Sequence, residues 1–430
     1  MMINTFEITR QEETAEAIYR IRGSSVVPRE TAQVVKEIID AVAVGGDEAL
    51  IEMTERFDGV SFEIEQLEMS DDELLRAYEE LPGEIQDALK KAEKRITRFA
   101  VESVSTDWEI EIDPGVLVGQ LQRPLDPVGI YVPGGRFAYP STVLMTGVPA
   151  REAGVRDIVF CIPPDKSGQI NDAALAATRL VGECRVFRVG GAQAVAAMAL
   201  GTKSVPKCQM VAGPGNIYVT TAKRLLSEAV ATDLEAGPSE IAVCVDGSVD
   251  ISYPAVDVLA QLEHDPLAVA VMVSESKEVL ESARKVMEDL AEEVGSETVS
   301  EGTVNLVHCN SRDLATQFVN SLAPEHLELM VEDLRELLPE IKSAGCVFIG
   351  LYSPVVLGDY LAGPSHVLPT GGSAARLSGL STQSFKRTMN VVSYSKEGFL
   401  ADSKEARVLA RLEGLEIHAL SIDARLKENT

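Results

Sequence analysis

The stretch Val128-Gly129-Ile130-Tyr131-Val132 begins a regular alternation of apolar, β-branched runs with longer helix-like segments. Buried parallel strands appear in a sequence as continuous apolar runs, and strand–helix repetition is typical of right-handed βαβ units. We therefore predict a doubly wound parallel sheet with helices on both faces. The other strands expected in this series are Ile158–Ile162, Val186–Val189 and Gln209–Val211.

A second strand–helix series runs from Ile241–Val245 to Cys346–Ile349 and predicts a second sheet of the same class. The first hundred residues have helical periodicity, whereas Trp108–Gln122 is expected to form strands. The chain after Ser384 is too short for a core of its own, so we expect it to dock on its own body or on a partner subunit. The fold class is therefore α/β, with two Rossmann-like doubly wound αβα domains, a helical N-terminal segment and a small C-terminal tail domain. The expected bounds are 1–24 for the N-terminal segment, 25–128 plus 239–383 for one αβα domain, 129–238 for the other, and 384–430 for the tail.

Charge, cysteine usage and the absence of long apolar runs limit the possible partners and the expected compartment. The formal net charge of −28 argues against nucleic acid or an anionic membrane, because phosphate binding needs clustered Lys and Arg. The six cysteines are scattered without a C-x-x-C pair, which is typical of reduced thiols in a reducing cytosol. The N-terminus shows no secretory signal, and no apolar run approaches the ~20 residues of a membrane helix. We therefore expect a cytoplasmic protein.

Histidine is the commonest protein metal ligand, and only five occur in the chain. Gln261 and His264 are three positions apart on a predicted helix that is ended by Asp265-Pro266, so both should project from one face of its final turn. An ion such as zinc could bind the imidazole nitrogen and the amide oxygen together. The alternative is a helix-end histidine whose polar atoms are satisfied by the backbone.

Three further short motifs carry metal-capable or proton-transferring groups. Asp359 follows a predicted strand, and we expect it in a loop at the strand's carboxyl end, where ligands of open α/β sheets bind, although a simple turn is the alternative. Glu325-His326 closes a predicted helix and supplies an adjacent carboxylate and imidazole, enough for two proton transfers. His418 would otherwise be a surface residue of the tail. Together these motifs indicate a metal-assisted enzyme.

The order of these motifs resembles histidinol dehydrogenase over nearly the whole chain. The motifs that carry the resemblance in one half are Ala236-Gly237-Pro238-Ser239-Glu240, Gln261-Leu262-Glu263-His264, Ala323-Pro324-Glu325-His326-Leu327, Gly358-Asp359-Tyr360, His366-Val367-Leu368-Pro369-Thr370 and Glu413-Gly414-Leu415-Glu416-Ile417-His418-Ala419. Those of the other half are Tyr131-Val132-Pro133-Gly134-Gly135, Gly190-Gly191-Ala192-Gln193 and Gly213-Pro214-Gly215-Asn216.

The resemblance implies oxidation of L-histidinol to L-histidine through an aldehyde, with two NAD in succession and one zinc ion per subunit. It assigns Glu325 and His326 to proton transfer. The zinc ligands that it implies are Gln261, His264, Asp359 and His418. The substrate contacts that it implies are Ser239, Glu413, His326 and the four zinc ligands. The NAD contacts that it implies are Tyr131, Gln193 and Asn216, which assigns the cofactor to 129–238 and the metal and substrate to the other αβα domain.

Two details depart from the usual patterns. No G-x-G-x-x-G follows a first strand, and only Gly134-Gly135 and Gly213-Pro214-Gly215 offer glycine-rich turns, so we expect NAD to bind weakly and in an atypical pose. Pro364-Ser365 precedes His366 where many members carry Thr-Asn. We therefore interpret His366 as a residue that supports the site from behind the ligands.

Four alternatives remain open from the residues alone. A thiol-based aldehyde dehydrogenase needs an activated cysteine in a polar loop, whereas Cys161 and the other five lie in or beside apolar strands. A zinc hydrolase needs a metal-held water, and a metal-stabilised scaffold would bind ligand without turnover. A fourth is another NAD-dependent amino-alcohol or aldehyde dehydrogenase of the same fold. From the short tail we also predict a homodimer in which Glu413 and His418 complete the neighbouring subunit's site.

Overall fold

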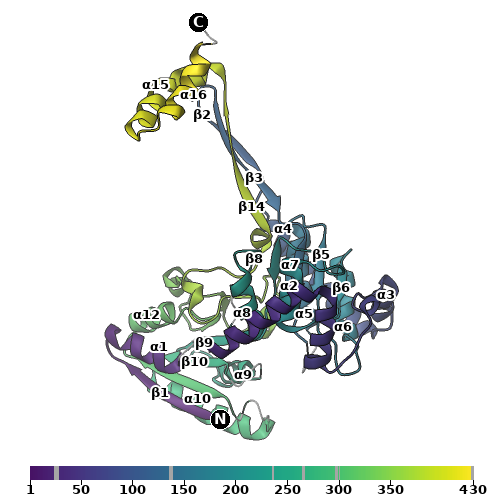
Figure 1. The fold of residues 1–430 in the computed structure, drawn as a ribbon. Coiled ribbons are helices and arrows are strands. Elements are labelled where there is room, and N and C mark those ends of the chain that lie inside the picture. Colours follow the sequence, from purple (N-terminus) through teal and green to yellow (C-terminus); the bar gives the residue numbers. More distant parts are fainter. Residues whose placement is uncertain are drawn as a thin grey trace. The chain divides into compact units, whose positions relative to one another are not determined.

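In a computed structural model the chain forms two compact units (Figure 1). The first comprises Met1–Ser103 and Leu125–Phe385, and the second comprises Val104–Pro124 and Lys386–Thr430. The second unit thus combines most of the predicted tail with the segment expected to form strands. The structure describes residues 1–23, 29–134, 139–234, 237–263, 267–295, 299 and 301–427. None of the described helices combines the length and apolar character that a membrane crossing requires.

The first predicted series forms a fully parallel five-stranded sheet in the described residues, in the order β6-β5-β4-β7-β8. Its strands are β4 (Val128–Tyr131), β5 (Ile158–Cys161), β6 (Arg185–Phe187), β7 (Met210–Ala212) and β8 (Ala231–Thr232). The helices between them are α5 (Pro140–Glu152), α6 (Asp172–Val181), α7 (Gly191–Leu200) and α8 (Ile217–Leu226). The strand–helix alternation predicted from the sequence is confirmed here.

Side chains of β4 alternate between the two faces of this sheet. Val128 and Ile130 pack with residues of α5 and α6, together with the N-terminal helices α3 (Asp71–Glu79) and α4 (Gly83–Glu102). Tyr131 packs on the other face with residues of α7, α8 and the long helix α2 (Arg29–Asp58). The alternation of side chains along a strand therefore gives one core on each face, as expected for an αβα domain.

The second series forms a parallel six-stranded sheet in the described residues, in the order β1-β11-β10-β9-β12-β13. Its strands are β1 (Met2–Ile8), β9 (Glu240–Val245), β10 (Val269–Ser274), β11 (Thr303–Cys309), β12 (His326–Met330) and β13 (Cys346–Ile349). Residues of α9 (Ser252–Gln261) and α10 (Lys277–Val294) cover one face, and residues of α1 (Thr14–Arg22) and α12 (Arg312–Leu322) cover the other. The short helices α13 (Leu334–Leu337) and α14 (Val355–Tyr360) follow β12 and β13.

Two strands of this sheet were not predicted. The N-terminal segment was expected to be helical, yet β1 pairs along its whole length with β11. Glu325-His326 was expected to close a helix, yet α12 ends at Leu322 and His326 begins β12. Ala323 has a φ of 45°, which ends the helix, and Pro324 cannot continue it.

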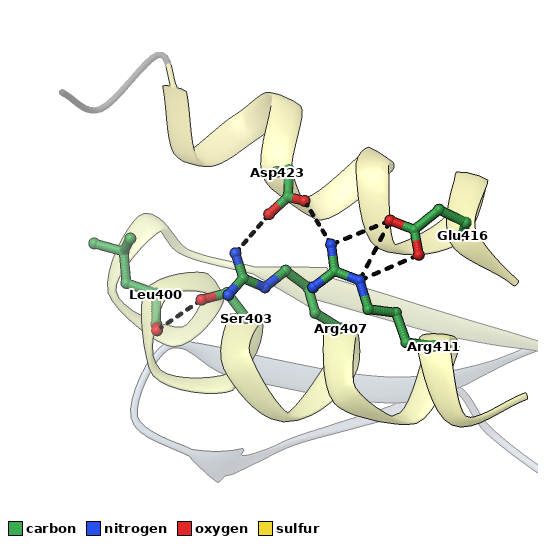
Figure 2. Close-up of polar contacts among 6 residues, drawn as sticks. All are labelled: Leu400, Ser403, Arg407, Arg411, Glu416 and Asp423. Atoms are coloured by element: carbon green, nitrogen blue, oxygen red, sulfur yellow. Dashed lines mark hydrogen bonds and ion pairs between the residues drawn. The ribbon is translucent and has the colours of Figure 1, made fainter. Parts of the chain in front are cut away.

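The second unit contains an antiparallel sheet of β2 (Trp108–Asp113), β3 (Val116–Pro124) and β14 (Lys386–Tyr394), in the order β14-β3-β2. Its helices α15 (Lys396–Leu412) and α16 (Glu416–Lys427) are tied together by two arginines (Figure 2). Arg407 Nη1 lies 2.5 Å from Asp423 Oδ1, and Arg411 pairs with both Glu416 and Asp423. These ion pairs fix the turn between the two helices.

Candidate active site

The amino ends of β9 and β12 hold the predicted proton-transfer pair. His326 is the first residue of β12 and Glu240 the first of β9, and the two strands are neighbours in the sheet. His326 Nδ1 lies 3.0 Å from the backbone oxygen of Glu240. A carbonyl oxygen only accepts, so Nδ1–H is the donor and the lone pair of the neutral imidazole lies on Nε2. This tautomer prepares Nε2 to accept a proton.

Glu325 is held by the same strand. Its Oε2 accepts a hydrogen bond of 2.8 Å from the backbone N–H of Glu240, and its side chain is buried. Burial raises the pKa of the Glu325 carboxyl well above its ordinary value, and the charges of Glu240 and Asp359 add to the effect. A carboxyl with a raised pKa is a stronger base once it is ionised, which suits general base catalysis.

Glu240 is a further residue of this site, not predicted from the sequence. Its buried carboxylate makes a two-pronged ion pair with Arg22 at the end of α1, at 2.8 Å and 2.7 Å. Such paired hydrogen bonds fix geometry as well as charge. Because the Glu240 backbone bonds both Glu325 and His326, the ion pair with Arg22 also fixes those two side chains. Glu240 lies within one of the recognised motifs, but its backbone role leaves no sequence signal.

Asp359 lies beside His326 but not where the sequence placed it. It belongs to α14 rather than to a loop, and its Oδ1 is 3.7 Å from His326 Nε2, at the amino end of β12. The helix after β13 therefore returns Asp359 to the edge of the sheet opposite to the expected one. His366 Nδ1 donates to the Asp359 backbone oxygen at 2.9 Å, and His366 Nε2 lies 3.2 Å from Thr142 Oγ1. His366 thus supports the segment that carries Asp359.

The other predicted metal ligands are only partly described. Gln261 is the last residue of α9, so the helix ends before His264, which lies outside the described residues together with Asp265-Pro266. Gln261 is buried, and its Nε2 has no hydrogen-bond partner among the described residues. The described residues contain no cluster of three or more His, Cys, Asp or Glu side chains that could hold a metal.

Gln261 and Asp359 nevertheless have the properties that a bound cation requires. Burial raises the pKa of Asp359 to about 7, because the ionised carboxylate lacks solvation there. A divalent cation would stabilise that charge and could take the amide oxygen of Gln261 as a ligand. A cavity of about 400 Å³, lined in part by His326, Asp359, His366, Cys346 and Phe348, offers room for a small substrate beside Asp359. The carboxylate of Asp359 and the amide oxygen of Gln261 are therefore donor groups of the kind that a zinc ion accepts.

Two neighbouring carboxyls, the buried Glu328 and the partly buried Asp257, lie next to this site. Glu328 follows His326 by two positions in β12, and its Oε1 accepts a hydrogen bond of 2.9 Å from the N–H of Val355, the first residue of α14. Burial and the charge of Asp257 raise the pKa of Glu328 to about 8, and burial raises the pKa of Asp257, on α9, to about 6. Glu328 thus connects the elements that carry His326, Gln261 and Asp359.

The predicted substrate contact Ser239 directly precedes β9 and is partly buried. Its backbone oxygen accepts a hydrogen bond of 2.9 Å from Val269, the first residue of β10. Gly237, in the same motif, donates its N–H to Thr370 Oγ1 at 2.5 Å. Ser239 therefore lies at the edge of the sheet where Glu240 and His326 begin their strands.

The predicted NAD contacts gather at the carboxyl edge of the five-stranded sheet. Tyr131 ends β4, Gln193 lies in the first turn of α7, and Asn216 precedes α8. Tyr131 is 4% exposed and Gln193 2%, and burial raises the pKa of Tyr131 to about 12. Asn216 is exposed, and its Oδ1 accepts from the N–H groups of Tyr218 and Val219. Its side-chain nitrogen is therefore the part that points away from the helix cap.

Glu413 and His418 belong to the second unit. Glu413 lies in the turn between α15 and α16, and His418 is in the first turn of α16. Both residues are exposed. Their apolar neighbours Leu412 and Ile417 are 80% and 81% exposed. This part of the second unit presents uncovered apolar surface around two polar residues.

Comparisons with known proteins identify the family. The histidinol dehydrogenase family model matches residues 22–426. The histidinol dehydrogenases of Carboxydothermus hydrogenoformans and Methanothermobacter thermautotrophicus are 42% and 43% identical, over 96% and 92% of this chain and 97% and 93% of theirs. The chain belongs to the histidinol dehydrogenase family. A solved histidinol dehydrogenase from Elizabethkingia anophelis matches with a TM-score of 0.93 at 31% identity and 99% coverage of both chains.

Membership in the histidinol dehydrogenase family makes the chain an oxidoreductase of histidine biosynthesis with a small-molecule substrate. A dehydrogenase of this kind uses an NAD-type cofactor in general. The thiols agree with this assignment, because burial raises the pKa of each cysteine, for example that of Cys244 to about 12. A thiolate nucleophile is therefore disfavoured at every cysteine of the chain.

Proposed function

We propose that the chain oxidises L-histidinol to L-histidine through L-histidinaldehyde, using two NAD and one zinc ion per subunit. The observation that carries this proposal is the Nδ1–H bond from His326 to Glu240, which leaves Nε2 as the base beside Asp359 and the cavity. Family membership supplies the substrate class, and the buried Glu325 supplies a second proton acceptor next to His326.

Zinc, when bound by Gln261, His264, Asp359 and His418, would hold the imidazole and amine of the substrate and so orient its alcohol carbon. NAD, bound near Tyr131, Gln193 and Asn216, would accept one hydride in each of the two oxidations. Ser239 and Glu413 complete the substrate contacts, and the carboxylate of Glu413 suits the cationic amine.

The protons are handled by His326 and Glu325. His326 Nε2 accepts the alcohol proton as the first hydride leaves, which gives the aldehyde. Water then adds to the aldehyde: Glu325 takes a proton from the water, and His326 returns its proton to the carbonyl oxygen. The resulting hydrate loses its second hydride while His326 again accepts a hydroxyl proton, which gives the acid. Glu325 and His326 then each release one proton to solvent, so the two oxidations together liberate two protons and both bases are restored.

Separate assays of the two oxidations test these roles. We expect Glu325→Gln to slow oxidation of added histidinaldehyde by on the order of 100-fold or more, and to slow oxidation of histidinol to the aldehyde far less. His326→Asn should slow both oxidations. Glu288→Gln, an exposed residue of α10, is the matched control. Equal slowing of both oxidations by Glu325→Gln would remove its role in activating water.

The metal is tested without turnover. Zinc content per subunit, measured after dialysis, should be close to one in the unaltered protein and should fall sharply in Asp359→Ala. Chelation should abolish histidinol oxidation, and added zinc should restore it. A protein that stays fully active after exhaustive treatment with EDTA, and contains no metal, would overturn the zinc assignment.

We further propose that the protein is a homodimer with composite sites, in which Glu413 and His418 serve the partner subunit. The uncovered Leu412 and Ile417 beside these residues support this, since such surface is usually an interface. Mixing a His418→Asn chain with a Glu325→Gln chain should restore about a quarter of full activity, because half of the dimers are mixed and each has one intact site. No recovery in verified mixed dimers would place both residues in the same chain's site.

A further inference from the structure

A buried ion pair lies behind the turn that joins β7 to α8. Lys223 is on α8 and Asp233 follows β8, and each side chain is only 1% exposed. The ammonium nitrogen lies 2.5 Å from Asp233 Oδ1. Burial of two charges is unfavourable unless the remaining hydrogen-bonding groups are also satisfied. The other hydrogen bonds of Lys223 and Asp233 therefore indicate which part of the backbone the pair holds in place.

The two side chains form hydrogen bonds with both backbone groups of Gly213, and these two bonds are called the clamp below. Lys223 Nζ also donates to the backbone oxygen of Gly213 at 3.0 Å, and Asp233 Oδ2 accepts from the N–H of Gly213 at 2.7 Å. The third ammonium hydrogen goes to the backbone oxygen of Leu234 at 2.8 Å. All three donors of Lys223 are thus used, two of them on backbone groups.

Gly213 lies against the last residue of β4. Its φ is 113°, and a Cβ there would lie 2.0 Å from the backbone oxygen of Tyr131. The turn continues through Gly215 to Asn216, whose side chain caps α8. The clamp on Gly213 therefore sets the positions of Tyr131 and Asn216 relative to each other.

The third hydrogen bond of Lys223 goes to the segment that precedes β9. Leu234 lies shortly before Ser239 and the first residue of β9, to whose backbone Glu325 and His326 are bonded. One ammonium group thus bonds both the turn on the dinucleotide side and the segment that leads to the proton-transfer pair. Charge neutrality alone would not require either backbone contact.

We propose that Lys223 and Asp233 are positioning residues of the dinucleotide site, which hold the turn 213–216 in the conformation that binds NAD before NAD arrives. The inference rests on the proposed use of NAD at Tyr131, Gln193 and Asn216. Neither side chain is accessible, so both act through the backbone of Gly213 rather than by touching the cofactor.

The test compares a single and a double variant with a matched control. Lys223→Met leaves Asp233 buried without its cation, whereas Lys223→Met with Asp233→Asn removes both charges and is more favourable to folding. We expect both folded variants to bind NAD on the order of 10-fold to 100-fold more weakly by calorimetry and to show the same rise in KM for NAD. The KM for histidinol should change much less. Lys203→Met, an exposed lysine, should behave as the unaltered protein.

Hydrogen exchange on the unaltered protein tests the same inference without a variant. The amide of Gly213 should exchange slowly in the absence of NAD, because the clamp is already formed, and NAD should add little protection. Fast exchange that becomes slow only with NAD would overturn the inference, as would unchanged NAD affinity in the folded double variant. A failure of the proposed function gives a different result: the unaltered protein would neither oxidise histidinol nor bind NAD.

Discussion

The two parallel sheets of the first unit have the same architecture, but the predicted site residues lie at opposite ends of their strands. Each has helices on both faces, and each reverses its strand order once, between β4 and β7 in the five-stranded sheet and between β9 and β12 in the six-stranded sheet. At the first reversal the predicted NAD contacts lie at the carboxyl ends of the strands, as is general for open α/β sheets. At the second reversal Glu240 and His326 lie at the amino ends.

Helix polarity explains why the two edges suit different ligands. Helices that follow parallel strands begin at the carboxyl edge, so α7 and α8 direct their amino ends, with partial positive charge, to the edge that carries the predicted NAD contacts. Such ends favour phosphate groups. The corresponding helices of the six-stranded sheet end at its amino edge: α9 ends at Gln261 and α12 ends at Leu322. Carboxyl ends of helices favour cations, which suits a metal and a cationic amine.

The largest effect is expected from a change at the carboxyl edge of the five-stranded sheet. Gly213→Ala adds a Cβ 2.0 Å from the Tyr131 backbone oxygen at a φ of 113°, so both the turn and β4 must shift. We expect a loss of several kcal/mol in stability and at least about 100-fold in kcat/KM for NAD. Thermal unfolding and steady-state kinetics measure the two effects.

Gly182 provides the control for that change. Its φ is 125°, yet nothing lies within 4 Å of an added Cβ. Gly182→Ala therefore has the backbone strain without the clash and should lose only about 1–2 kcal/mol, with unchanged KM for NAD. Equal losses in the two variants would mean that the close approach of the turn to Tyr131 has no role of its own.

A smaller effect is expected in the six-stranded sheet, where the buried carboxyl of Glu328 has no cationic partner among the described residues, unlike Asp233. The pKa of Glu328 is about 8 in the folded chain, above the ordinary value of 4.5, so folding favours its protonated form. Its contribution to stability is complete below pH 4.5 and is lost as the pH rises towards 8. Glu328→Gln should remove this loss and be more stable than the unaltered chain at pH 9 by on the order of 2 kcal/mol.

Urea unfolding followed by circular dichroism at pH 5, 7 and 9 measures the difference. The two chains should have similar midpoints at pH 5 and separate progressively as the pH rises. Glu288→Gln, at an exposed site, should show no separation. Parallel pH profiles for the unaltered chain and Glu328→Gln would contradict a protonated carboxyl in the folded protein.

The sequence predicted the alternating elements well because buried parallel strands are apolar throughout. It did not predict β12, whose buried residues His326 and Glu328 are polar: His326 bonds the backbone of β9, and Glu328 bonds the first residue of α14. It also missed β1, whose partner β11 is about three hundred positions away in the chain. Local patterns carry no information about such long-range pairing.

The site was predicted in part: its side chains were recognised, but the residues that act through their backbone were not. Glu325, His326 and Asp359 were recognised from motifs, and the structure brings their side chains together. The predicted position of Asp359 was wrong. The general rule places ligand-binding residues at the carboxyl ends of strands, whereas α14 runs back and brings Asp359 to the amino end of β12. The roles of Glu240 and Gly213 depend on backbone groups, which every residue has, so no residue type signals them.

The smallest effect is expected from the one thiol that shares the active-site cavity. Cys346 is the first residue of β13, pairs with His326 across the sheet and lines the cavity with Asp359. Burial and the charge of Asp359 raise the pKa of this thiol, so it is not a thiolate at neutral pH. Cys346→Ser should therefore change kcat/KM for histidinol by no more than about twofold, as should Cys184→Ser, whose thiol is in the other sheet's domain. A loss of 100-fold or more in Cys346→Ser alone would mean that the aldehyde is oxidised through a thioester on Cys346. In that case the amino edge of the six-stranded sheet would hold a nucleophile rather than the base and water that His326 and Glu325 supply.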